Sequence, residues 1–332
     1  MVGYQLLTSR AVLGMFGDKL EQFEGESWIP ELSMGPVLSD QAVEDYPFLG
    51  HVPTLRAKSG PPKAEGLRVK NITIRNEEYD VAIAIPDKWR RRDKTGQLDQ
   101  RIAEFGDAQS VHWLDLISPL QADGEILPSF TGSPFYSATH VWGKSGVQSN
   151  IVTLSMATDF PFTTPGTVDR PSTQALAYAI IQGIKNIMTK RSDQGKVMHT
   201  SRRRWTCVFP MKLWDAGVAG ISQMVLAGGQ DNLLKGLIAA GHQIRVEMNP
   251  ELDASMGGAL SQFLVYATDA PRKAYIRQEE DLSGARAGVD LQVLDENSDH
   301  WKQNREIVVI AYASRGVGLG DPFTSAKVKI VA

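Results

Sequence analysis

The hydrophobic pattern between Gly66 and Leu120 changes period once. Leu67–Ile74 and Tyr79–Ile85 are rich in strand-forming residues, which predicts two strands paired as a β-hairpin. A polar run separates them from apolar positions at helical spacing, which predict an amphipathic helix over 97–120. Both arms of the hairpin carry charge, so we expect a projecting arm; a lone two-stranded arm is marginally stable and finds its cover on another molecule. We predict inter-subunit contacts for its charged residues and for those that follow it: Arg68, Lys70, Arg75, Glu77, Glu78, Asp80, Arg90, Arg91 and Arg92.

Residues 1–59 show one weak helical pattern, from Ser9 to Phe23. The segments after it are interrupted by prolines, which exclude a continuous helix or a central strand. We interpret the stretch as an extended arm that lies across this subunit or a neighbour. A disordered leader is the alternative, and it fits less well with the large apolar side chains Trp28, Tyr46, Phe48 and Leu49, which need to be buried.

The pattern beyond Leu120 begins as loops and then alternates between helix and strand. Glycine and proline break the periodicity up to Pro171. A helix is predicted from Ser172 to Arg191, a buried strand at Arg204–Phe209, and a helix directly after Pro210. A short helix after Asp231 and a strand at His242–Met248 complete the predicted α/β lobe.

The last third of the chain consists of strand patterns. The predicted strands are Gln262–Thr268, Lys273–Gln278, Val289–Leu294, Glu306–Ser314 and Ala326–Val331. The run Ile307–Tyr312 is apolar at every position, so we expect a central strand that is covered on both faces. The predicted fold class is α+β.

Composition adds limits to this picture. A chain of 332 residues exceeds the roughly 250–300 at which single cores stop growing, so two lobes are expected. Hydrophobic residues make up 42%, charged residues 22%, and the formal net charge is −3, which does not favour binding of nucleic acid or of a polyanionic substrate. No run approaches the roughly 20 apolar residues of a membrane span, and Met1–Gln5 does not begin a signal peptide, so we expect a cytoplasmic protein.

Candidate chemistry is sparse. The six histidines do not occur at metal-ligand spacings, and the single cysteine, Cys207, has the setting of a small apolar residue in a buried strand. Gly316–Gly320 resembles a phosphate-binding loop, but Asp321-Pro322 stands where the helix should begin. We therefore expect no catalytic residue, cofactor or metal. Two basic runs, Lys88–Arg92 and Arg202–Trp205, could meet phosphate or an acidic face of a partner subunit, or simply be solvated.

The order of these parts resembles the Hong Kong 97-type viral capsid fold. More narrowly, the chain resembles the Mu-like major head protein family of the gpT type, through four segments in the same order. These are Tyr46–Arg56 followed by Gly60; Tyr79–Asp87 with Asp93 and Gly96; Gly132–His140, where Thr131 replaces the usual aspartate; and Trp205–Pro210 with Asn249–Leu252.

This resemblance implies an arrangement of domains. Residues 1–59 would be an N-terminal arm and 60–96 an extended β-hairpin loop that reaches a neighbour. Residues 97–164 would be a peripheral domain with the spine helix 97–120, residues 165–281 an α/β axial domain, and residues 282–332 strands that return to the peripheral domain.

The resemblance also implies a function. The chain would be a non-enzymatic major capsid protein of a tailed double-stranded DNA phage or Mu-like prophage, assembling as hexamers and pentamers in the bacterial cytoplasm and remaining in the virion. Portal, scaffold and decoration proteins would be partners, and packaged DNA would lie nearby. Two alternatives stay open: the shell of an encapsulin-like nanocompartment or gene-transfer agent, and, in another class, an α/β enzyme that uses Gly316–Gly320.

Overall fold

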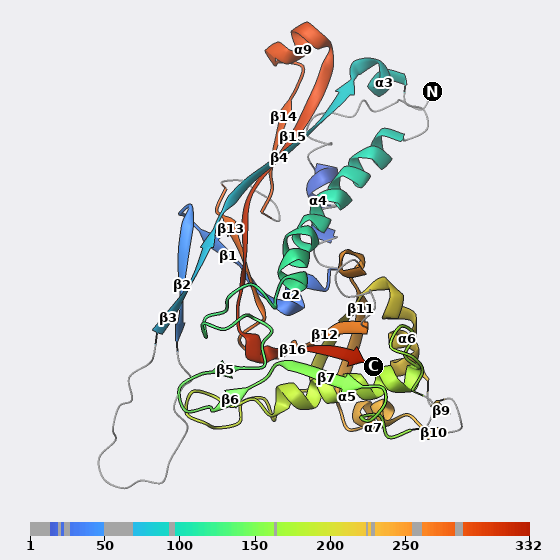
Figure 1. Ribbon diagram of the computed structural model, residues 1–332. Coiled ribbons are helices and arrows are strands. Elements are labelled where there is room, and N and C mark those ends of the chain that lie inside the picture. Colours follow the sequence, from blue (N-terminus) through green and yellow to red (C-terminus); the bar gives the residue numbers. More distant parts are fainter. Residues whose placement is uncertain are drawn as a thin grey trace.

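The computed structural model describes residues 14–18, 21–22, 27–49, 69–92, 97–162, 165–223, 225–226, 230–253, 261–282 and 288–332. They form two lobes, one long and narrow and one compact (Figure 1). No helix in these described ranges is long and apolar enough to cross a membrane.

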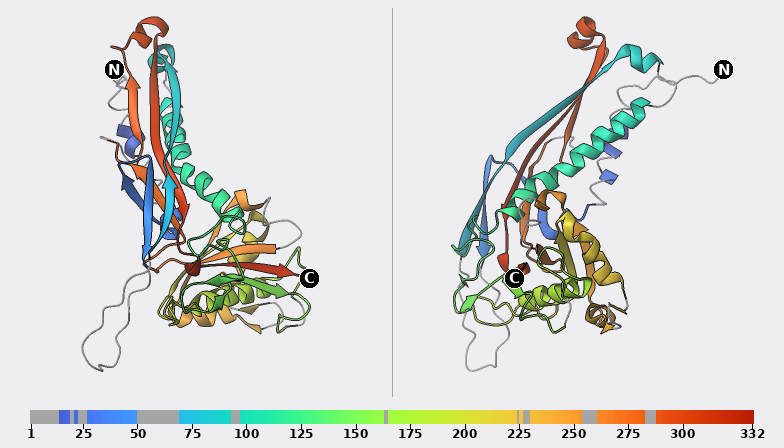
Figure 2. Two further views of the ribbon diagram at one scale, coloured as in Figure 1. Left: turned by 60° about the vertical axis from the view of Figure 1, so that its left-hand side comes forward. Right: turned by 45° about the vertical axis from the view of Figure 1, so that its right-hand side comes forward.

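The elongated lobe is a five-stranded sheet with a 26-residue helix along one face (Figure 2). Its strands run in the order β1–β13–β15–β14, and β4 pairs with β15. Ile102 and Phe105 of the helix pack on Val309 and Ala311 of the sheet. The elements are α2 (Ile29–Leu32), β1 (Ser33–Ser39), β4 (Glu77–Pro86), α3 (Asp87–Arg92), α4 (Gln97–Ala122), β13 (Tyr275–Glu280), β14 (Asp290–Leu294), α9 (Asp299–Asn304) and β15 (Glu306–Leu319).

The compact lobe is a second five-stranded sheet in the order β11–β8–β12–β16–β7, with helices packed on one face (Figure 1). Buried apolar residues of α5, such as Ile180 and Ile184, meet Phe263 and Val328 of the sheet. The elements are β5 (His140–Val141), β6 (Val147–Gln148), β7 (Ile151–Ser155), α5 (Thr173–Met188), β8 (Arg204–Phe209), α6 (Met211–Ser222), β9 (Val225–Leu226), β10 (Gln230–Asp231), α7 (Leu233–Ala239), β11 (Gln243–Met248), η1 (Pro250–Leu252), β12 (Ser261–Ala267), η2 (Pro322–Thr324) and β16 (Ser325–Val331).

A third apolar cluster joins the two lobes. Trp113 and Ile117 of α4 pack with Leu264 of β12 and Tyr275 of β13, and Leu32 of α2 belongs to the same cluster. The strands β12 and β13 are separated by only a short connection, yet they belong to different sheets. The lobes therefore share one continuous core at their junction.

The predicted hairpin of residues 67–85 is wrong in its pairing. β3 (Val69–Arg75) pairs with β2 (Val43–Leu49), and β4 pairs with β15 instead. Only Asn76 separates β3 from β4, and a connection of one residue is too short for the chain to fold back as a hairpin. The true hairpin is β2–β3, and its connection, residues 50–68, lies outside the described ranges.

The run Ile307–Tyr312 lies in a central strand, β15, as predicted, but the strand is not fully covered on both faces. β15 has β4 on one side and β14 and β13 on the other. Ile307, Val309 and Ala311 are buried toward α4, whereas Val308 and Ile310 on the opposite face are only half-buried. The outer face of the sheet is therefore open along this stretch of the subunit.

Gly316–Leu319 forms the end of β15 and Gly320 follows it directly, so this run is not a phosphate loop. A Cβ on Gly316 would lie 2.6 Å from the Arg75 carbonyl oxygen, and one on Gly318 would lie 2.5 Å from the Ile74 Cδ1. Ile74, on β3, is buried. The glycines therefore remove side chains where the β2–β3 hairpin packs on the outer face.

Most other predicted elements are confirmed, including α5, β8, α6, α7, β11 and the late strands. The loop-rich stretch after Leu120 also holds β7, which prediction missed. The expected joint return of residues 282–332 to one domain is wrong in part, since β14 and β15 join the elongated lobe while β16 joins the compact one. Residues 14–18 and 21–22 are helical, and the rest of the predicted helix Ser9–Phe23 lies outside the described residues.

Candidate inter-subunit surface

The predicted contact residues divide between β4 and segments around it. Glu78 and Asp80 alternate with the half-buried Tyr79 and Val81, so their side chains lie on the outer face of the sheet, away from α4. Glu77 and Arg75 are exposed at the junction of β3 and β4. Arg68 lies outside the described residues, as do the side chains of Lys70, in β3, and of Arg90, Arg91 and Arg92, in α3. Of the four whose side chains the structure describes, it thus places Glu78 and Asp80 on one open face.

The outer face brings these two carboxylates to others that sequence reasoning did not single out. Tyr312 of β15 lies opposite Asp80 on one side and Asp290 of β14 on the other. Burial raises the pKa of the Tyr312 hydroxyl, and a hydrogen bond to Glu78 and the charges of Glu78, Glu280 and Asp80 raise it further. We call Glu78, Asp80, Glu280 and Asp290 the acidic band.

An apolar strip continues from the acidic band toward α9. Its residues are Ala82 and Ala84 of β4, Val308 and Ile310 of β15, and Leu294 of β14, which lie in cross-strand register. The alanines are exposed and the other three are half-buried. A strip of this kind on an open sheet face is typical of a surface that another molecule covers.

The β2–β3 hairpin covers the other end of the same face. Tyr46 of β2 donates from its hydroxyl to Gln278 Oε1 of β13, at 2.7 Å. Burial, followed by the charge of Glu44, raises the pKa of Tyr46 to about 12, so this hydroxyl remains a donor. Together with Ile74 above the glycines, the bond holds the hairpin against the elongated lobe (Figure 1).

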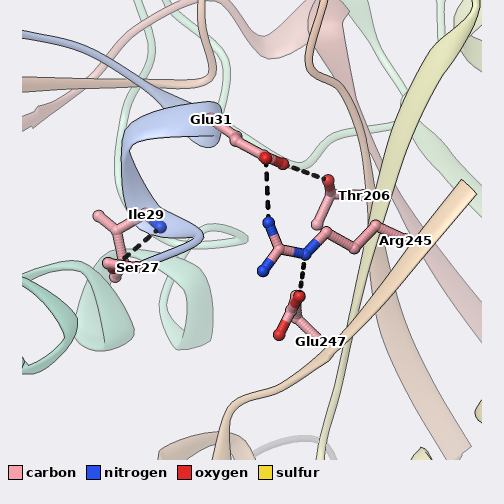
Figure 3. Close-up of polar contacts among 6 residues, drawn as sticks. All are labelled: Ser27, Ile29, Glu31, Thr206, Arg245 and Glu247. Carbon is pink, nitrogen blue, oxygen red and sulfur yellow. Dashed lines mark hydrogen bonds and ion pairs between the residues drawn. The ribbon is translucent and has the colours of Figure 1, made fainter. Parts of the chain in front are cut away.

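The N-terminal segment is held at the junction of the lobes by α2. Glu31 accepts from Arg245 of β11 at 3.0 Å and from Thr206 of β8 at 3.2 Å (Figure 3). Arg245 also contacts Glu247 on its own strand. Ser27 accepts from the Ile29 backbone N–H just before the short helix. Residues 27–32 therefore pack on this same subunit.

A buried pair of arginines fixes α4 to the sheet, and sequence reasoning missed it. The guanidinium groups of Arg277 and Arg315 lie 5.0 and 4.6 Å from the Trp113 ring centroid, within cation–π range. Arg277 also donates to the Gly35 carbonyl oxygen of β1 at 3.1 Å. Each residue alone looks like an ordinary surface arginine in the sequence, so no local signal predicts the pair.

The described residues contain no group of three or more His, Cys, Asp or Glu side chains placed to hold a metal ion. Cys207 is fully buried, and burial raises the pKa of its thiol far above the ordinary value. Such a thiol is a poor nucleophile. What the geometry offers is a long open sheet face with charged and apolar parts.

Comparison with known proteins agrees with this architecture. Residues 14–163 match the model of the family described as Mu-like prophage major head subunit gpT. The predicted family resemblance is thereby confirmed over just under half of the chain. A search of curated protein sequences finds no significant match.

Solved structures extend the likeness to nearly the whole chain. The capsid of the cyanophage P-SCSP1u aligns at a TM-score of 0.52 and 11% identity, covering 90% of this chain and 86% of that one. The mature capsid of bacteriophage PhiM1 gives 0.51 and 14%, covering 92% and 87%. A virus-like particle from Pyrococcus furiosus gives 0.50 and 9%, covering 95% and 98%. The chain has the Hong Kong 97-type fold of phage shell proteins, and its first half carries the sequence pattern of the Mu-like head subunit.

Proposed function

We propose that this protein is the major capsid protein of a tailed double-stranded DNA phage or Mu-like prophage, which assembles as hexamers and pentamers into an icosahedral head. The match of residues 14–163 to the Mu-like head subunit carries the proposal, because that stretch includes the β2–β3 hairpin, β4 and α4. The open outer face of the sheet supports it, since a shell subunit needs extensive surface for its neighbours. The role is structural and non-enzymatic.

The lobes take different parts in this proposal. The elongated lobe with α4 would be the peripheral domain, with α4 as its spine. The compact lobe would be the axial domain near the centre of each ring. Residues 43–75 with their connection would be the extended loop that reaches a neighbour. Portal, scaffold and decoration proteins, packaged DNA and assembly in the bacterial cytoplasm belong to the same proposal.

Size-exclusion chromatography with light scattering tests assembly. We expect the expressed protein, with a scaffold protein supplied if needed, to elute as particles of megadalton mass. A stable monomer or dimer under all these conditions would contradict the proposal.

A shortened loop tests the inter-subunit role of the hairpin. Leu49 and Val69 are paired at the end of the hairpin, so a short glycine-rich turn can replace residues 51–67 without disturbing the described strands. We expect a folded monomer with unchanged thermal stability that does not assemble. The matched control replaces the exposed Lys144 at the β5–β6 turn with glycine and should still assemble. Normal particles from the shortened loop would rule out this role.

A second candidate function is the shell of a nanocompartment, which the likeness to the Pyrococcus furiosus virus-like particle favours. Both candidates predict closed particles, so the contents decide between them. A phage head packages double-stranded DNA when terminase and portal are present, whereas a nanocompartment encloses protein cargo without them.

A further inference from the structure

The acidic band lacks an ion-pair partner within the described part of the subunit. None of Glu78, Asp80, Glu280 and Asp290 forms an ion pair with a described residue, although Tyr312 and Gln292 hydrogen-bond to Glu78 and Asp290. The four carboxylates converge on one tyrosine, where like charges at close range repel each other.

A second charged surface, of opposite sign, lies where β8 begins and β12 ends. It consists of Arg202, Arg203, Arg204 and Lys273, which we call the basic rim; the first three are the basic run noted in the sequence. Arg203 and Arg204 are exposed and the other two half-buried. Arg202 donates to the Asp269 carbonyl oxygen and Lys273 to that of Thr268, so both side chains use main-chain acceptors. Asp269 lies at this surface and accepts from the Arg203 backbone N–H at 2.8 Å, and its charge and that of Glu31 act on Lys273, but no described carboxylate forms an ion pair with any of the four side chains.

His242 is a poor hydrogen-bond partner for Arg203. The Trp205 indole N–H donates to His242 Nδ1 at 2.9 Å, so the ring proton of neutral His242 is on Nε2. Arg203 Nη1 lies 2.6 Å from that Nε2. Two donors therefore face each other, and neither can satisfy the other. A carboxylate oxygen from outside would accept from both groups.

The two surfaces cannot neutralise each other within one subunit. Lys273 lies two residues before β13 and Glu280 ends that strand, whose length from Tyr275 to Glu280 alone is roughly 17 Å. Charges at this distance are screened, because the Debye length is about 8 Å at physiological ionic strength. The opposite surfaces can approach only when they belong to different copies.

We propose that the acidic band of one copy binds the basic rim of the next copy in a head-to-tail contact. This inference rests on the proposed function and names a contact within it. A contact between two different surfaces of identical subunits is heterologous, and it closes into rings when the rotation permits. Charge pairs of this kind fix register and partner choice more than they add affinity.

Charge reversal in matched pairs tests the contact. Variant one carries Glu78→Lys and Asp80→Lys, and variant two carries Arg203→Glu and Arg204→Glu. Assembly is followed by light scattering, and folding of the monomer by circular dichroism. We expect each variant to reduce the yield of particles at least tenfold, and particles to return when both variants are combined in one chain. Glu104→Lys on α4 and Lys185→Glu on α5, both exposed, control for the change in net charge and should assemble normally.

Other results separate the alternatives. If the wild type forms particles and both variants assemble as well as the controls, the contact is refuted while the proposed function stands. If the wild type never forms particles, the proposed function fails first. If variant two assembles normally but loses bound double-stranded DNA in a filter assay at low salt, the rim binds nucleic acid and the proposed contact is overturned. If neither variant assembles and the combination does not restore particles, direct pairing of the two surfaces is refuted.

Discussion

Gly316 and Gly318 show how the absence of a side chain lets the β2–β3 hairpin pack on β15. β15 is otherwise a β-forming strand, and glycine weakens a strand interior. Glycine is nevertheless needed at these positions, because Ile74 and the Arg75 carbonyl group occupy the space where a Cβ would stand. In the sequence the glycine run resembles a phosphate-binding loop. In the structure the space above these glycines is occupied by β3.

Gly316→Ala should therefore destabilise the subunit. The new Cβ would meet the Arg75 carbonyl oxygen at 2.6 Å, and backbone must move to relieve the contact. We expect a loss of about 1–3 kcal/mol in the free energy of unfolding. Urea denaturation measures it. Gly236→Ala is the control: its Cβ meets nothing within 4 Å on a helix, so the change should be neutral or stabilising. Equal effects of the two substitutions would contradict this view of the hairpin contact.

His112 makes a second prediction at the residue scale. Burial first, and then the Arg315 charge, lower its pKa from 6.5 to about 4. Between these two values the unfolded chain binds a proton that the folded chain does not, so stability is lost as the pH falls from 6.5 toward 4. His112→Gln should remove this part of the pH dependence. Unfolding measured across pH 4–7.5 for both proteins checks it, and parallel curves would contradict it.

The segment α2 shows which kind of contact holds an element in place. Its ion pair with Arg245 is close to half exposed on both sides, at 46% for Arg245 and 42% for Glu31. Leu32, beside it, is 2% exposed in the apolar cluster that joins the lobes. Exposed ion pairs contribute little to the free energy of unfolding. Truncating a buried leucine leaves a cavity and lowers that free energy much more.

Leu32→Ala should accordingly cost about 2–5 kcal/mol, and Glu31→Gln at most about 1 kcal/mol. Denaturation of the monomer measures both. Limited proteolysis of the same proteins should show faster cleavage near residues 27–33 in Leu32→Ala only. A larger loss for Glu31→Gln would mean that the polar contacts of Figure 3 dominate.

Elements with a strong local period could be predicted, and pairings could not. The helices α4 and α5 and the strands β8 and β11 follow their periodic patterns closely. β3 and β4 were found, but their partners β2 and β15 are chosen by contacts with residues far away in the chain. β1 and β2 were missed because Pro36 and Pro47 argue against strands, and both prolines lie in strands at an edge, where they are tolerated.

The same limit applies to the candidate surface. Glu78 and Asp80 could be predicted from the charged strand, whereas Glu280, Asp290 and Tyr312 come from strands about 200 residues later in the sequence. Only the pairing of β15 with β4, β14 and β13 brings them together. The spacing of residues in the sequence does not predict the register between these strands.

At the scale of the whole molecule, the two lobes form one subunit in which part of the long sheet is uncovered. The shared cluster around Trp113 and Leu264 joins the lobes, while the outer face of the long sheet remains partly open. A monomer with this much uncovered sheet is expected to associate, and many identical weak contacts give a cooperative lattice. The fold thus accounts for the proposed assembly.

Electron cryo-microscopy of the assembled protein tests the central claim most directly. We predict closed icosahedral particles in which this subunit forms rings of five and six, with the outer face of each long sheet covered by a neighbour. Discrete small oligomers, or a monomer whose sheet face stays uncovered at every protein concentration, would contradict the account.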